Sequence, residues 1–264
     1  VKLRVERLAH AAPLVLLRIV ASPNFTRVWR KPVGRLFSAP GFFLGLSRRT
    51  LPLWARVVNA WLGLDTPKAA METLLSGKMG IQSGFFSSRA AEAEGYADLL
   101  RRVSFALLVG ERNQYAGALQ GMLLERLVAA FKYGALPDSP ASKRWLVQVA
   151  ATQCARVLSV RVAPENRTTL WPIVMAELQR ILLSPADAQP SLLLAACSLV
   201  DTLLTVLPDD FSSFGWMFVP CSSGEGTPPR AHSLFAALLT PLATPRAKAG
   251  VAPPVAAAAP ERTS

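Results

Sequence analysis

Apolar residues recur at helical spacing along most of this chain, and prolines or glycines separate one such stretch from the next. The clearest stretch covers residues 170–183, with Thr168 and Thr169 before its first turn and Pro172 inside it. Its apolar stripe consists of Trp171, Val174, Leu178, Ile181 and Leu182. Each such helix has to bury one face, so we expect the helices of this chain to stack on one another.

The same pattern predicts further helices, bounded by capping residues and by helix breakers. They cover residues 2–20, 25–38, 52–62, 66–75, 88–109, 112–132, 140–163 and 192–207. Pro32 and Gly34 weaken the stretch over 25–38 as a single helix. Gly134 is expected to end the helix predicted over 112–132. No strand-like alternation of comparable length competes. The sequence therefore predicts an all-α fold, an irregular α-solenoid or HEAT-like helical array.

Composition divides the chain into three parts. Residues 1–50 form a basic N-terminal helical segment, and residues 51–219 form the helical-array domain. Residues 220–264 are a Pro- and Ala-rich low-complexity tail that is expected to be mostly disordered, with a short helix near 231–239. Because the chain begins with Val1 and not with Met, it is a candidate fragment of a longer protein.

Positive charge is concentrated at one end of the chain. Residues 1–56 hold eleven Lys or Arg and one acidic residue, whereas residues 57–264 carry only +2 of the net charge of +12. The candidate basic surface consists of Arg27, Arg30, Lys31, Arg35, Arg48 and Arg49. This surface suits anionic lipid or an acidic partner. The alternative, slightly favoured over it, is a solvated basic face that contacts an acidic segment of a longer parent protein. Nucleic-acid binding by a basic helical repeat is the less favoured alternative, because no base-reading motif accompanies the charge.

The sequence offers no reaction centre, so no catalytic residue, metal site or cofactor is expected. Its two histidines, His10 and His232, lie at opposite ends of the chain, and neither has a partner at metal-ligand spacing. Cys154 and Cys197 fall within apolar stripes and are expected to be small buried residues. No window supplies the apolar length of a membrane span, and the basic residues before an apolar run at the N-terminus fit an ordinary helix better than a targeting signal.

Most of the six tryptophans lie within helical apolar patterns and are expected to pack in the core. In the helix over 170–183, Glu177 is expected to pair with Arg156 or Arg161. A surface ion pair of this kind contributes little to stability.

Four ordered blocks of residues resemble the C-terminal region of the Dopey family, over about residues 25–220. The first is Trp29-Arg30-Lys31-Pro32-Val33 with Leu36-Phe37, Phe42-Phe43 and Trp54-Ala55-Arg56-Val57-Val58. The second is residues 99–107, followed by Gln114-Tyr115 and residues 123–127. The third is Leu170-Trp171-Pro172-Ile173 with Glu177-Leu178, and the fourth is residues 196–201 with residues 216–219. The motif residues expected to matter structurally are Trp171, Pro172, Glu177, Leu178, Asp201 and Trp216.

The resemblance implies part of a very large, non-enzymatic helical scaffold in endosome–Golgi membrane traffic and protein transport. It implies peripheral attachment to the cytosolic face of Golgi, trans-Golgi network and endosome membranes. It also implies association with a large scaffold related to Arf exchange factors and an indirect link to an aminophospholipid flippase. The resemblance carries no catalytic residue.

Overall fold

The structure is a computed structural model that describes residues 2–75, 88–135, 143–183 and 189–214. All regular elements within these ranges are helical, which confirms the predicted all-α fold. The predicted low-complexity tail and the short helix near 231–239 lie outside the described residues, as does Trp216.

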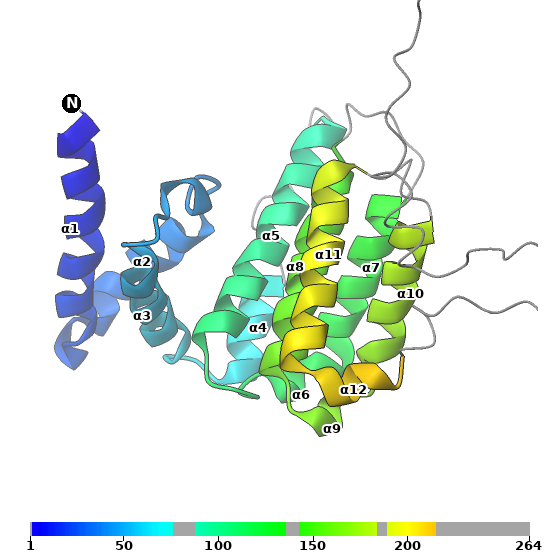
Figure 1. Ribbon diagram of the computed structural model, residues 1–264. Helices are drawn as coiled ribbons and strands as arrows, with labels where there is room; N and C mark the ends of the chain where they lie inside the picture. The colour runs from blue at the N-terminus through cyan, green and yellow to red at the C-terminus, as the bar shows by residue number, and fades with distance from the viewer. Residues whose placement is uncertain (1, 76–87, 136–142, 184–188, 215–264) are drawn as a thin grey trace, which may run out of the picture.

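Three helices form the N-terminal part of the fold: α1 (Lys2–Val20), α2 (Thr26–Ser38) and α3 (Leu51–Leu62) (Figure 1). A short 3₁₀ turn, Pro23–Phe25, precedes α2. A second one, Phe43–Gly45, lies in the loop between α2 and α3. α2 packs against α3 through Trp29, Val33 and Val57, all of which are buried. These helices lie to one side of the remaining array in all three ribbon views.

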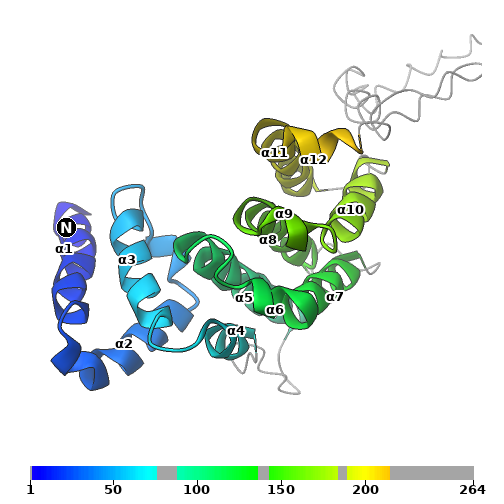
Figure 2. The ribbon, with the colours of Figure 1, turned by 90° about the horizontal axis from the view of Figure 1, so that it is seen from below.

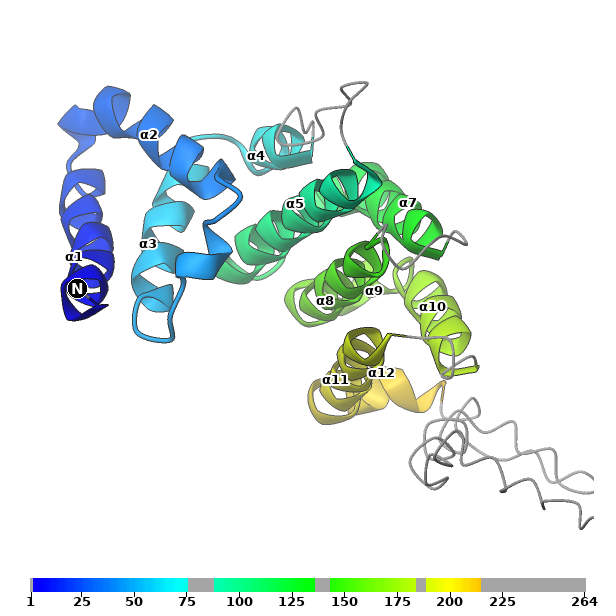
Figure 3. The same ribbon diagram turned by 90° about the horizontal axis from the view of Figure 1, so that it is seen from above.

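Six longer helices form a curved array of two layers (Figures 2 and 3). One layer contains α5 (Arg89–Val109), α8 (Trp145–Arg161) and α11 (Pro190–Val206) side by side. The other contains α4 (Pro67–Leu75), α7 (Leu124–Ala135) and α10 (Trp171–Leu183). The short helices α6 (Ala116–Ala118), α9 (Pro164–Arg167) and α12 (Pro208–Ser212) lie in the connections. Stacked helix pairs of this kind are the arrangement expected of an α-solenoid.

The core follows the predicted apolar stripes. The stripe of α10 is buried along its length, from Trp171 to Leu182. α5 and α8 lie in the middle of the array and bury residues on nearly every side. Ser88 caps α5, since its hydroxyl accepts a hydrogen bond from the Ala91 amide at 3.2 Å.

α2 is one continuous helix, although Pro32 and Gly34 predicted a weakened one. Trp29, Val33 and Phe37 bury one face of α2, and this packing outweighs the backbone hydrogen bond that Pro32 cannot donate. Gly34 allows close approach to α3, because a Cβ atom there would lie 3.1 Å from the Trp61 ring.

The helix predicted over 112–132 was wrong at both ends. α6 begins only at Ala116, a π-helical turn (Leu119–Leu123) follows it, and α7 then continues through Gly134 to Ala135. Gly121, at φ +108°, lies within the π-helical turn. Gly134 fails to end the helix because its missing side chain allows α7 to pack tightly against Gln148 of α8.

Candidate functional site

The basic candidate surface divides between one helix and one loop. Arg27, Lys31 and Arg35 lie at four-residue intervals on α2, and all three are exposed. Arg30, on the same helix, donates hydrogen bonds to both carboxylate oxygens of Asp65 at 2.8 Å. Asp65 lies between α3 and α4, so Arg30 links α2 to the start of the array, while the other three bases of α2 remain turned to solvent.

Arg48 and Arg49 lie in the loop before α3, where they are exposed. Ser47 and Thr50 shape this loop through mutual hydrogen bonds, including one at 2.9 Å from the Ser47 amide to the Thr50 hydroxyl. Among the described residues, neither Arg48 nor Arg49 forms an ion pair with an acidic side chain. The loop bases are thus available to a ligand but belong to a different element from the stripe on α2.

Exposed apolar side chains accompany the bases of α2. Phe25 is 54% exposed, Val28 68% and Leu36 45%, while Leu44 in the following loop is 91% exposed. Spacing along α2 places Val28 and Leu36 beside the line of Arg27, Lys31 and Arg35. A basic stripe next to exposed apolar residues is typical of helices that bind an anionic, partly apolar surface.

The family-motif residues differ in burial: some pack in the core and others are exposed. Trp171 is 7% exposed and its ring lies 5.8 Å from that of Phe214. Leu178 is buried, whereas Pro172 and Asp201 are exposed. Trp216 is not among the described residues.

The predicted partner of Glu177 was wrong. Its carboxylate binds Arg180 of the same helix, at 2.9 Å from Nε and 2.5 Å from an NH₂ group. Arg156 instead donates to the Thr202 hydroxyl at 2.5 Å, and Arg161 donates to the Gly110 carbonyl. Arg156 therefore joins α8 to α11 and Arg161 joins α8 to the end of α5, so neither faces α10.

Of the two cysteines expected to be buried, only Cys154 is. It is 2% exposed within α8, and burial raises the pKa of its thiol to about 11. Cys197 lies on the outer side of α11 and is exposed, so the prediction for it was wrong. The apolar pattern of α11 did not predict this exposure, because Cys197 lies beside the buried Ala196 at the edge of the apolar face.

The two cysteines should differ sharply in alkylation at pH 8. In a Cys221→Ser background we expect iodoacetamide to modify Cys197 at the rate of an exposed thiol, because Cys197 is accessible in the native fold. Cys154 should react only after denaturation, since its thiol is inaccessible and stays protonated at pH 8. Intact-mass spectrometry over time measures both. Equal native-state rates for the two thiols would contradict the described burial.

Two arginines are buried away from the basic surface, and one of them joins two helices. Arg167 of α9 is 4% exposed and forms an ion pair with Asp210 of α12 at 2.7 Å. Arg102 of α5 is also 4% exposed, and burial lowers its pKa while the nearby Asp98 carboxylate raises it. The ion pair of Arg167 joins α9 to α12, whereas Arg102 and Asp98 lie on the same helix.

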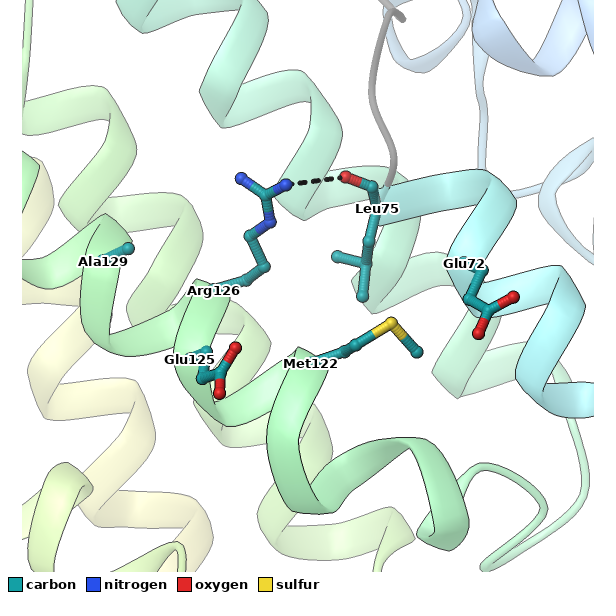
Figure 4. Close-up of a pocket in the computed structure, with 6 residues that line it drawn as sticks. All are labelled: Glu72, Leu75, Met122, Glu125, Arg126 and Ala129. Carbon is teal, nitrogen blue, oxygen red and sulfur yellow. Dashed lines mark hydrogen bonds between the residues drawn. The ribbon is translucent and has the colours of Figure 1, made fainter.

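An open hollow of about 410 Å³, which was not predicted from the sequence, lies between α4 and α7 (Figure 4). Its lining residues are Glu72, Leu75, Met122, Glu125, Arg126 and Ala129. They come from two helices and the π-helical turn, so no local spacing brings them together. Their convergence follows only from the packing of α4 against α5 and α6.

Within the described ranges, no three His, Cys, Asp or Glu side chains gather closely enough to hold a metal ion. No helix in those ranges combines the length and apolar character that crossing a membrane requires.

Comparison with known proteins identifies the family. A family model described as DOP1 C-terminal matches residues 2–247. The chain is 30% identical over 213 residues to "Protein dop1" of Emericella nidulans, an alignment that covers 75% of this chain and 11% of that protein. It is 27% identical over 230 residues to "Protein DOP1B" of Xenopus laevis, covering 74% of this chain and 9% of the relative.

A "Protein DOP1 homolog" of Drosophila melanogaster is 30% identical over 173 residues, which are 64% of this chain and 6% of the fly protein. The chain thus spans about a tenth or less of the length of these relatives. No solved structure matches it significantly. Because the family model covers residues 2–247 and so every described residue, the chain belongs to the DOP1, or Dopey, family and corresponds to its C-terminal region.

Proposed function

We propose that this chain is a non-enzymatic helical scaffold segment in endosome–Golgi membrane traffic and protein transport. Its membership of the DOP1 family over residues 2–247 is the observation that carries the proposal. The two-layer array supports it, because stacked helix pairs present extended surfaces to other macromolecules.

We further propose the cytosolic face of Golgi, trans-Golgi network and endosome membranes as its location. The proposed partners are a large scaffold related to Arf exchange factors and, indirectly, an aminophospholipid flippase. Imaging of the tagged chain with Golgi and endosome markers, together with affinity purification, tests this proposal. A chain absent from these membranes and from trafficking complexes would leave it without support.

The exposed side of α2 is the part of the fold best suited to an anionic membrane. Arg27, Lys31 and Arg35 provide three bases, and Phe25 and Val28 provide exposed apolar area next to them. Each base near an anionic membrane contributes about 1 kcal/mol to binding, so removing all three should weaken binding measurably. An acidic protein segment is the competing ligand for the same bases.

Liposome flotation separates these ligands. We expect the chain to float with vesicles that contain phosphatidylserine and to stay unbound with neutral vesicles. Replacing Arg27, Lys31 and Arg35 with Gln should reduce the bound fraction about 100-fold at limiting lipid, because three phosphate-facing charges are lost.

The matched control replaces three exposed bases elsewhere, Lys68, Arg112 and Lys132, and should bind as the original chain does. Raised salt should release the original chain, since the attraction is screened. Binding that ignores both salt and lipid charge would exclude the membrane role and leave the acidic protein segment as the ligand of α2.

A further inference from the structure

We propose that the loop between α2 and α3 inserts Leu44 into the acyl region of an anionic membrane. The chain would then distinguish loosely packed from tightly packed lipids of equal charge. This inference rests on the proposed membrane role of α2. It adds a second element of the fold and a second property of the membrane, the packing of its lipids, which attraction between charges does not detect.

Leu44 lies at an exposed tip of this loop. It is 91% exposed, more than any other large hydrophobic residue in the described ranges. It belongs to the 3₁₀ turn Phe43–Gly45, and a Cβ atom added at Gly41 or Gly45 would have no heavy atom from beyond its chain neighbours within 4 Å. The turn therefore stands clear of the rest of the fold, so Leu44 has room to enter a flat surface.

Aromatic residues on both sides of this turn hold it in place. The Phe42 ring, just before the turn, lies 5.2 Å from that of Trp54 of α3. The Phe43 ring, inside the turn, lies 6.1 Å from that of Phe105 of α5. Because the turn is fixed to two helices, Leu44 is displayed outward before a membrane arrives, which lowers the entropic cost of inserting it.

The charge around the loop is positive. Residues 7–64 contain nine Lys or Arg and no acidic residue, so no acid of this stretch offsets the two exposed bases of the loop, Arg48 and Arg49. The array helix that contacts the loop, α5, is followed by Glu111 and Arg112, whose charges cancel. A basic environment of this kind favours an anionic membrane surface.

Exposed apolar residues gather in the same basic part of the chain. Seven of the twelve exposed large hydrophobic side chains lie before residue 52, although this is much the shorter part of the described residues. Phe25 and Val28 on α2 are among them. A solvated basic face does not need these residues, whereas a surface that enters the boundary between headgroups and acyl chains does.

Insertion makes the binding sensitive to lipid packing. The Leu44 side chain gains free energy by leaving water, but the bilayer has to open a space for it. That space forms more readily where unsaturated chains pack loosely. Bases that bind phosphate groups at the surface need no such space, so they respond to lipid charge and to salt instead.

Flotation with two sets of vesicles of equal phosphatidylserine content tests the insertion. One set has loosely packed dioleoyl chains and the other has tightly packed dimyristoyl chains, at a temperature where both bilayers are fluid. We expect the full 264-residue chain to favour the dioleoyl set. Leu44→Ser should lower the affinity for that set about tenfold and remove the preference, because an inserted apolar side chain is lost.

Leu194→Ser is the matched control. Leu194 is 69% exposed on α11, away from α2 in Figures 1 and 2. Its replacement should change the affinity for either set of vesicles by no more than about twofold. Because both leucines are exposed, the melting curves of the two variants should match that of the original chain.

A fluorophore on the loop reports its position directly. In a Cys197→Ser, Cys221→Ser background the remaining cysteine, Cys154, is buried. Leu44→Cys in this background can therefore be labelled selectively with nitrobenzoxadiazole. The emission of this label should rise and shift to the blue when vesicles bind, whereas a label introduced by Leu194→Cys should not respond.

Three results would overturn the insertion while leaving the membrane role of α2 intact. They are equal binding of the original chain to both sets of vesicles, undiminished binding by Leu44→Ser, and an unresponsive label on the loop. If the original chain binds neither set, the membrane role of α2 fails and the insertion fails with it. An acidic, partly apolar protein segment would then be the ligand of this part of the fold.

Discussion

Replacing Trp171 with Ala is expected to lower the free energy of unfolding by about 3–5 kcal/mol. Trp171 is 7% exposed at the start of α10, and its ring packs at 5.8 Å against that of Phe214, just after α12. The truncation would remove a large apolar side chain and leave a cavity where α10 meets the end of α12. Urea unfolding followed by circular dichroism measures the loss.

Gln179→Ala provides the matched control on the same helix. Gln179 is exposed, so its replacement should change stability by no more than about 0.5 kcal/mol. If Trp171→Ala unfolds at the same urea concentration as the original chain, the indole is accessible and serves as a contact for other molecules. That result would contradict the packing described for α10.

The second large effect is expected at Phe37, which is fully buried on α2. Its ring lies 5.1 Å from that of Phe42, 5.8 Å from Trp61 and 5.9 Å from Phe105. Phe37→Ala should cost about 3–5 kcal/mol. It should also weaken the connection between α2 and the array, because Phe105 belongs to α5.

Leu36 supplies the control for Phe37, since it is adjacent on α2 and 45% exposed. We expect Leu36→Ala to change the stability by about 0.5 kcal/mol or less. Near-UV circular dichroism should lose its aromatic signal in the Phe37 variant and keep it in the Leu36 variant. Equal stability and equal spectra for the two variants would show that the aromatic cluster does not join α2 to α5.

Helix existence could be predicted from this sequence because each helix carries its own apolar stripe and its own breaker. Trp171, Val174 and Leu178 illustrate this, since their spacing alone identified a buried face. Boundaries were less predictable where tertiary contacts override local preference. α2 continues through Pro32, and α7 continues through Gly134, because each packs against a neighbouring helix that the local sequence does not specify.

Partners of polar side chains were the least predictable feature. Glu177 binds Arg180 one turn away, whereas Arg156 reaches Thr202 on another helix. The pairing of Glu177 with Arg180 follows from helical spacing, whereas that of Arg156 with Thr202 depends on the stacking of α8 on α11. The hollow between Glu72 and Glu125 has the same origin, so it became visible only once α4 and α7 were placed. The basic side of α2 was predictable because its bases are local in sequence.

Hydrogen–deuterium exchange read by mass spectrometry tests the stacked array most directly. α5 and α8 lie in the middle of the array and bury residues on nearly every side, so their amides should exchange slowest and with similar protection. Peptides from α1, at one end of the fold, should exchange fastest among the long helices. Exchange of α5 and α8 as rapid as that of α1 would contradict the account.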